Sequence, residues 1–215
     1  MSAQKITSGG ICTYGDGLTW EYINKDENDF LFHEIFIANS YIQYGIDICD
    51  GDVIVDLGAN IGLFSLYCQS IAEDVHIVAV EPLQPIFEVL RRNLLTIENT
   101  LLVHGAVGNP PVMGSSELFL YNQQCPGEST RNLTEWRDMQ SILNVSIKNL
   151  PDDTVLPSRN VSRDEETLCS SFSCPIYSLT EIIRTANLSC IDLLKVRPWI
   201  YIYTSNNAHI LCSRW

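Results

Sequence analysis

The 215-residue sequence has few basic residues and no long apolar run, and both shortages exclude functions. Lysine and arginine together number 13 against 26 acidic residues, which gives a net charge of −13. A sequence-independent nucleic-acid binder needs a basic surface, which is missing here, as is a polybasic membrane patch. No stretch reaches the roughly 18 apolar residues of a membrane-spanning helix. We therefore expect neither nucleic acid nor a membrane among the partners.

The N-terminal segment and the cysteines both favour a reducing compartment. MSAQKITSGG lacks the apolar core of a secretory signal. Among the eight cysteines no pair forms CxxC, and none stands at zinc-finger spacing with a histidine. The expectation is a cytoplasmic protein with reduced thiols and no metal site, and its length fits one domain.

The rest of the chain is organised around residues 51–65, GDVIVDLGANIGLFS, which read as a buried strand, a glycine turn and a helix start. The β-branched run 53–55 suits a strand that is covered on both faces. Asp56 follows it, and Gly58 and Gly62 flank the turn. Such a unit presents free backbone N–H groups and a positive helix end to a ligand.

An acidic residue sharpens this interpretation. Glu81 ends the next strand, HIVAVEP, and lies 23 residues beyond Gly58. In nucleotide-binding βαβ units, an acidic residue about 20 residues after the glycines accepts hydrogen bonds from ribose hydroxyls. NAD is a poorer candidate, because the turn lacks GxGxxG spacing. A short dehydrogenase is also disfavoured, because the chain has no Tyr-x-x-x-Lys pair.

Strands and helices are expected to alternate, which predicts an α/β fold with a parallel sheet and right-handed crossovers. The expected strands are 53–57, 76–80, 101–107 and 190–196, and the expected helices are 29–45, 61–71, 84–95 and 178–188. Gly45 is the expected end of the first helix, and Ser178 and Glu181 form a capping box. Residues 11–15 and 18–23 read as a hairpin. The sheet order is predicted to be 3-2-1-4.

Composition divides the chain into three parts. Residues 1–50 form a lead-in and helical cap, 51–196 form the main domain, and 197–215 form a tail. Residues 108–173 are rich in Asn, Ser, Asp and Pro and show little periodicity beyond 117–121, so they are interpreted as a long, partly disordered insertion.

The motifs VDLGANIGLFSLY, VAVEP, FEVLRRNL, HGAVG and IDLLKV occur in this order and resemble the FkbM-type methyltransferases. The resemblance covers roughly residues 30–108 and 175–196. It implies a Rossmann-like, S-adenosylmethionine-dependent methyltransferase that methylates a hydroxyl of a polyketide-like or carbohydrate-like small molecule.

The resemblance also implies roles for individual residues. The residues that cradle the methionine part of the cofactor would be Gly58, Ala59, Asn60 and Gly62. Asp56 would support that turn, Glu81 would bind the ribose hydroxyls, and Gly105 and Ala106 would border the adenine.

The sequence departs from the family after Val196. The family continues with an acidic residue and a glutamate, whereas this chain continues with Arg197, Pro198 and Trp199. The expectation is a sheet that is incomplete on its C-terminal side and a truncated family member.

The catalytic residue is not identified by the sequence, because the acidic pair that the family places after LLKV is missing. His33, Glu34 and His104 are the remaining candidates for a base, but an exposed helix face is the favoured explanation for His33 and Glu34, and a strand end for His104. The alternative function is a cofactor-binding remnant or interaction protein without catalysis. Neither the acceptor nor the oligomeric state follows from the sequence.

Overall fold

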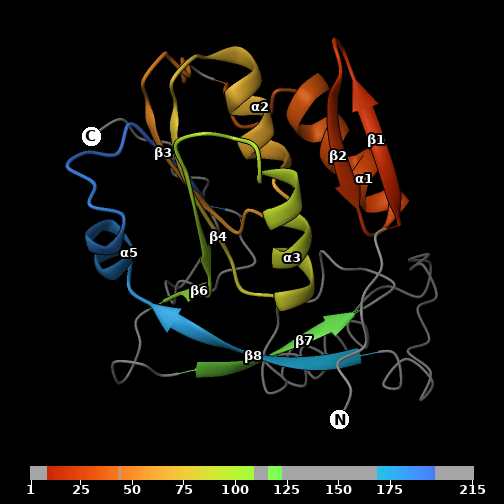
Figure 1. The fold of residues 1–215 in the computed structure, drawn as a ribbon, viewed down its shortest axis with the longest axis vertical. Helices are drawn as coiled ribbons and strands as arrows, with labels where there is room; N and C mark the ends of the chain where they lie inside the picture. Colours follow the sequence, from red (N-terminus) through yellow and green to blue (C-terminus); the bar gives the residue numbers. More distant parts are fainter. Residues whose placement is uncertain (1–8, 44, 109–115, 123–168, 197–215) are drawn as a thin grey trace, which may run out of the picture.

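Four parallel strands form the centre of the computed structural model, which describes residues 9–43, 45–108, 116–122 and 169–196 (Figure 1). The strands are β3 (Val53–Leu57), β4 (His76–Glu81), β5 (Thr100–His104) and β9 (Leu193–Val196). They lie in the order β5-β4-β3-β9, and all three pairings are parallel. The predicted α/β class and the order 3-2-1-4 are confirmed.

The sheet is apolar on both faces, which is why its strands read as continuous hydrophobic runs. In β3, Ile54 belongs to one core cluster, while Val55 and Leu57 belong to the cluster on the opposite face. In β4, residues 77 and 79 join the first cluster and residues 78 and 80 the second. Strands that are buried on both sides in this way are typical of parallel sheets covered by helices.

Helices cover both faces (Figure 1). The helices α2 (Leu63–Ile71) and α3 (Gln84–Asn93) lie on one side, and α5 (Leu179–Thr185) lies on the other. The predicted capping box is present at the start of α5, where the Ser178 hydroxyl accepts from the Glu181 N–H and the Glu181 carboxylate accepts from the Ser178 N–H. Among the described residues, none of the helices has the length and apolar character needed to cross a membrane.

The N-terminal hairpin forms a further layer beside α2 and α3 (Figure 1). Its strands, β1 (Gly10–Tyr14) and β2 (Leu18–Tyr22), pair antiparallel as the sequence predicts. The hairpin is joined to α3 by Asn93, whose side chain accepts from the Glu21 N–H at 2.7 Å and donates to the Glu21 carbonyl at 2.9 Å.

The helix predicted at 29–45 is wrong at both ends. The helix α1 (Lys25–Phe32) begins earlier, because the Asn24 side chain caps the Glu27 N–H at 3.0 Å. It continues as a short π-helix, η1 (His33–Ile37), in which the Ala38 N–H donates to the His33 carbonyl. Asn39 then adopts a left-handed φ of 50° and ends the helical run before Gly45.

The strand predicted at 101–107 is divided between two sheets. Gly105 separates β5 from the short β6 (Ala106–Val107), which pairs with β8 (Cys169–Tyr177). The strand β7 (Ser116–Asn122) pairs with the other edge of β8. Two strands therefore lie at least partly within the segment 108–173, where the sequence predicts little regular structure, while residues 123–168 and the tail lie outside the described residues.

A buried hydrogen bond between the hairpin and α1 gives a test of this layer. Trp20 Nε1 donates to Asn28 Oδ1 at 2.7 Å, and both residues are buried. Asn28→Ala leaves the indole N–H without that acceptor, so the free energy of unfolding should fall by about 2 kcal/mol. Urea denaturation measures the change. Arg91→Ala, which removes only an exposed ion pair with Glu88, should cost less than about 1 kcal/mol. Equal costs for the two variants would contradict the assignment.

Candidate functional site

The carboxyl ends of β3, β4 and β9 meet around the glycine turn, and a buried ion pair lies there. Lys195 Nζ donates to Asp56 Oδ1 at 2.7 Å and to the Gly58 carbonyl at 3.0 Å. The other Asp56 oxygen accepts from the Ser65 hydroxyl at 3.0 Å. Both charged residues are almost fully buried. Asp56 is therefore linked to the turn through Lys195, which bonds both the Asp56 carboxylate and the Gly58 carbonyl.

Sequence reasoning missed Lys195. The residue is the single charged residue of the strand Leu193–Val196, and an unpaired charge in a buried strand is costly. That cost indicates a partner of opposite charge, and Asp56 is directly opposite in the β3–β9 register. The signal was present in the sequence, but it required the strand register to be known. The Lys195 ammonium group also lies 5.5 Å from the Tyr41 ring centroid and 5.6 Å from that of Phe64.

The turn itself uses all five of its backbone N–H groups within the protein. The N–H groups of Gly58 and Ala59 both donate to the Val80 carbonyl, at 2.9 and 3.0 Å. The Asn60 N–H donates to Glu81 Oε2 at 3.0 Å, and the Ile61 N–H donates to Asn60 Oδ1 at 2.6 Å. The Gly62 N–H donates to the Ala59 carbonyl at 3.0 Å. The expectation that these groups are free for a ligand is therefore wrong. The turn is held in shape by its own hydrogen bonds, with Gly58 at φ 73° and Asn60 at φ 53°.

Glu81 lies beside this turn and is 3% exposed. Its carboxylate accepts from the N–H groups of Asn60 at 3.0 Å and Leu83 at 2.9 Å. Burial raises the pKa of Glu81 to about 7, although these two N–H groups and Lys195 oppose the shift. A carboxylate offers about four acceptor positions, so about two remain for further donors. The structure thus brings Glu81, Asp56 and the turn together at one edge, as the sequence predicts.

Two of the predicted site glycines have a packing reason for lacking a side chain. A Cβ atom on Gly62 would lie 2.8 Å from Leu90 Cδ1, and the residue has a φ of 92°. A Cβ atom on Gly105 would lie 2.5 Å from Tyr177 Cε2. Gly105 is also tied to the strand end, because its N–H donates to the Glu81 carbonyl at 3.1 Å. Ala106 is buried in β6.

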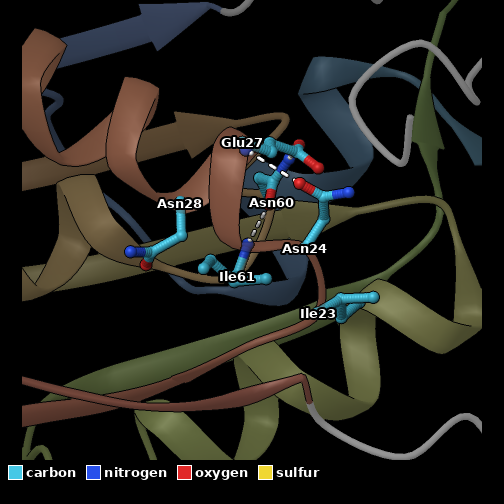
Figure 2. A pocket seen from close by; sticks show the side chains of 6 residues that line it. All are labelled: Ile23, Asn24, Glu27, Asn28, Asn60 and Ile61. Atoms are coloured by element: carbon cyan, nitrogen blue, oxygen red, sulfur yellow. Dashed lines mark hydrogen bonds between the residues drawn. The ribbon is translucent and has the colours of Figure 1, made fainter. Parts of the chain in front are cut away.

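Asn60 connects the turn to α1. Its side-chain amide donates to Glu27 Oε1 at 3.0 Å, as Figure 2 shows. A small cavity lies at this junction, lined by Ile23, Asn24, Glu27, Asn28, Asn60 and Ile61. The N-terminal turn of α1 therefore lies directly against the glycine turn.

The three candidate bases are not brought together at one place. His33 is exposed on η1, and Glu34 follows it on the same element. His104 is the residue opposite Glu81 in the β4–β5 register, its Nε2 lies 3.0 Å from the Pro82 carbonyl, and burial lowers its pKa. Within the described ranges, no group of three or more potential ligands is arranged to hold a metal ion.

The fold and the site define a class. An open parallel sheet, a strand–glycine–helix turn and a carboxylate at the end of the neighbouring strand are typical of α/β proteins that bind a nucleoside-containing cofactor.

Comparison with known proteins shows which methyltransferases the chain resembles. The chain is 38% identical over 78 residues to the 31-O-demethyl-FK506 methyltransferase FkbM of Streptomyces tacrolimicus, a match that covers 36% of the chain and 30% of that protein. It is 42% identical over 82 residues to the methyltransferase sdnD of Sordaria araneosa, covering 37% of the chain and 30% of that protein. It is 31% identical over 182 residues to the AMB antimetabolite synthetase AmbE of Pseudomonas aeruginosa, covering 81% of the chain and 8% of that protein.

No model of a protein family matches the chain. In each of these three relatives, the chain spans less than a third of the relative's length. Over the matched residues, the chain is similar to the FkbM-type methyltransferases.

The steric role of Gly105 can be separated from a role in ligand binding. Gly105→Ala should lower the free energy of unfolding by about 1–3 kcal/mol, because the added methyl group overlaps the Tyr177 ring. In the double variant with Tyr177→Ala, the total loss should be smaller than the sum of the two single losses. Denaturant titration of the four proteins measures this coupling. A Gly105→Ala variant as stable as the parent would contradict the packing role.

The buried carboxyl of Glu81 predicts a pH dependence of stability. Its folded-state pKa of about 7 lies above the ordinary glutamate value of 4.5, so the folded protein holds an extra proton between these two pH values. Its contribution to stability is therefore fully present below about pH 4.5 and is lost as the pH rises through about 7, with a total of about 3 kcal/mol. The stability difference between parent and Glu81→Gln should shift by this amount over the window. Parallel pH profiles from urea denaturation would overturn the assignment.

Proposed function

We propose that the chain binds S-adenosylmethionine at the carboxyl ends of β3 and β4 and transfers its methyl group to a hydroxyl of a small molecule. The observation that carries the proposal is the Glu81 carboxylate, which lies at the end of β4 and is joined to the glycine turn through the Asn60 N–H. Similarity to FkbM and sdnD supports the reaction type, because both relatives are named as methyltransferases.

The chemistry of the site fits the nucleoside part of this cofactor. Ribose hydroxyls are donors, and Glu81 keeps about two acceptor positions beyond those used by Asn60 and Leu83. The cofactor has no phosphate, so the acidic character of this edge is compatible with it. Because Glu81 is 3% exposed, binding requires the groups that cover it to move apart.

When bound, the cofactor would supply a methyl group on a sulfonium: the acceptor oxygen would bond to the methyl carbon in line as the C–S bond breaks and the neutral thioether leaves. The residues of the chain then have three tasks: to orient the cofactor, to hold the acceptor hydroxyl near the methyl group, and to accept its proton. Correct orientation of the methyl group and the acceptor hydroxyl can account for a large part of the reduction in the activation barrier. The turn and Glu81 account for the first task. The acceptor is proposed to be polyketide-like or carbohydrate-like, as the family resemblance implies, and the FkbM relative is itself named for methylating 31-O-demethyl-FK506.

Calorimetric titration tests the cofactor site directly. The parent chain should bind S-adenosylmethionine and S-adenosylhomocysteine, and Glu81→Ala should weaken both by about 1.5–3 kcal/mol, the range for hydrogen bonds to a charged group. Glu88→Gln on α3 serves as the matched control and should bind like the parent, because the Glu88 carboxylate accepts hydrogen bonds from Gln84 and Arg91 on its own helix and is not joined to the turn.

The transfer step is tested separately. Incubation with the cofactor and a panel of polyketide and sugar hydroxyl compounds should release S-adenosylhomocysteine and give a methyl ether. Equal cofactor affinity of parent and Glu81→Ala would refute the ribose role. Cofactor binding without transfer to any hydroxyl in the panel would favour a cofactor-binding protein without catalysis.

A further inference from the structure

The Lys195–Asp56 ion pair lies at the point where the sheet changes direction. From β3 the chain builds outward through β4 to β5 on one side, while β9 occupies the other side. Ligands of open α/β sheets bind outside the carboxyl ends of the strands at such a switch point. Asp56 and Lys195 are opposite each other in the register, one residue before the ends of β3 and β9.

The pair belongs to the same face of the sheet as Glu81. Side chains alternate along a strand, so residues two positions apart share a face of the sheet. Asp56 therefore shares a face with the preceding Ile54, Glu81 with residues 77 and 79, and Lys195 with Leu193. These preceding residues all belong to the core cluster that packs against α2 and α3. The two carboxylates and the ammonium group are therefore the buried charges on this face of the described sheet.

We propose that Lys195 sets the relative affinity of the site for the positively charged cofactor and its neutral product. Lys195 acts as a positioning residue: it holds the Gly58 carbonyl and cancels the charge of Asp56 beneath the turn. This inference rests on the proposed function.

The physical reason is that methyl transfer changes the charge of the cofactor. S-adenosylmethionine carries a sulfonium, and S-adenosylhomocysteine carries an uncharged thioether. A site with an unbalanced carboxylate would hold the cation more tightly and leave the affinity for the product almost unchanged. At an effective dielectric constant of about 20, one unit charge about 10 Å away changes the affinity for a cation by roughly tenfold. Because Lys195 balances the charge of Asp56, the ion pair keeps the difference in affinity between the cofactor and its product small.

The test compares the ratio of the two dissociation constants, product over cofactor, in matched variants. Lys195→Met removes the positive charge and keeps the length of the side chain, so the Asp56 carboxylate loses its counter-charge. The ratio should rise by about tenfold. The double variant Lys195→Met with Asp56→Asn removes both charges, and its ratio should return to within about threefold of the parent.

Structural damage alone gives a different result. Ser65→Ala removes the hydroxyl bond to Asp56 without changing the charge, so it should leave the ratio unchanged even if both affinities fall. If Lys195→Met and the double variant show the same ratio as the parent, the inference is wrong although the proposed function stands. A parent chain that binds neither ligand overturns both.

A measurement on the unmutated protein covers the case in which Lys195→Met does not fold. The ammonium group of Lys195 is buried and hydrogen-bonded, so its ¹⁵N resonance can be followed by NMR. Saturation with S-adenosylmethionine should move this resonance more than saturation with S-adenosylhomocysteine does. Equal shifts with the two ligands would overturn the inference.

Discussion

The contact between Asp56 and Lys195 is the interaction on which the rest of the structure depends. It joins β3 to β9 across 139 residues of sequence, and it also reaches the Gly58 carbonyl of the turn. Removing one partner of such a buried pair typically costs about 3–5 kcal/mol, because an uncompensated charge remains. The register of the two strands, the burial of the sheet end and the shape of the turn are therefore coupled, and none of them changes alone.

The fold explains why most residues of the motif have the side chains they have, and Glu81 is the exception. Gly62 and Gly105 lack side chains because Leu90 and Tyr177 occupy the space. Asn60 suits a left-handed turn position, and all its side-chain groups form bonds within the protein.

Glu81 is different, because a fully buried carboxylate with a raised pKa is costly and an uncharged side chain would pack without that cost. Groups of this kind cluster at functional sites, so Glu81 is the residue that most strongly indicates a ligand.

Most of the central sheet could be predicted from the sequence, because β-branched runs and glycine turns mark parallel strands directly. The strand 53–57, the sheet order and the capping box of α5 follow from local patterns. The end of α1 was mispredicted, because the left-handed Asn39 rather than Gly45 terminates the helical run. Lys195 was missed for another reason: its role depends on the pairing of β9 with β3, a strand far away in the sequence. Local patterns contain propensity and periodicity, but they do not contain register.

The separation of β3 and β9 in the sequence has a consequence for synthesis on the ribosome. In the register, Leu193 pairs with Ile54 and Lys195 pairs with Asp56, and the two residues of each pair are 139 positions apart in the sequence. At elongation rates of about 5–20 residues per second, this interval lasts on the order of ten seconds. Throughout it, one edge of β3 and the Asp56 carboxylate have no partner from β9. The nascent chain therefore passes through a stage in which β3 can pair with β4 while the glycine turn still lacks its anchor, and a chaperone would meet the protein in that form.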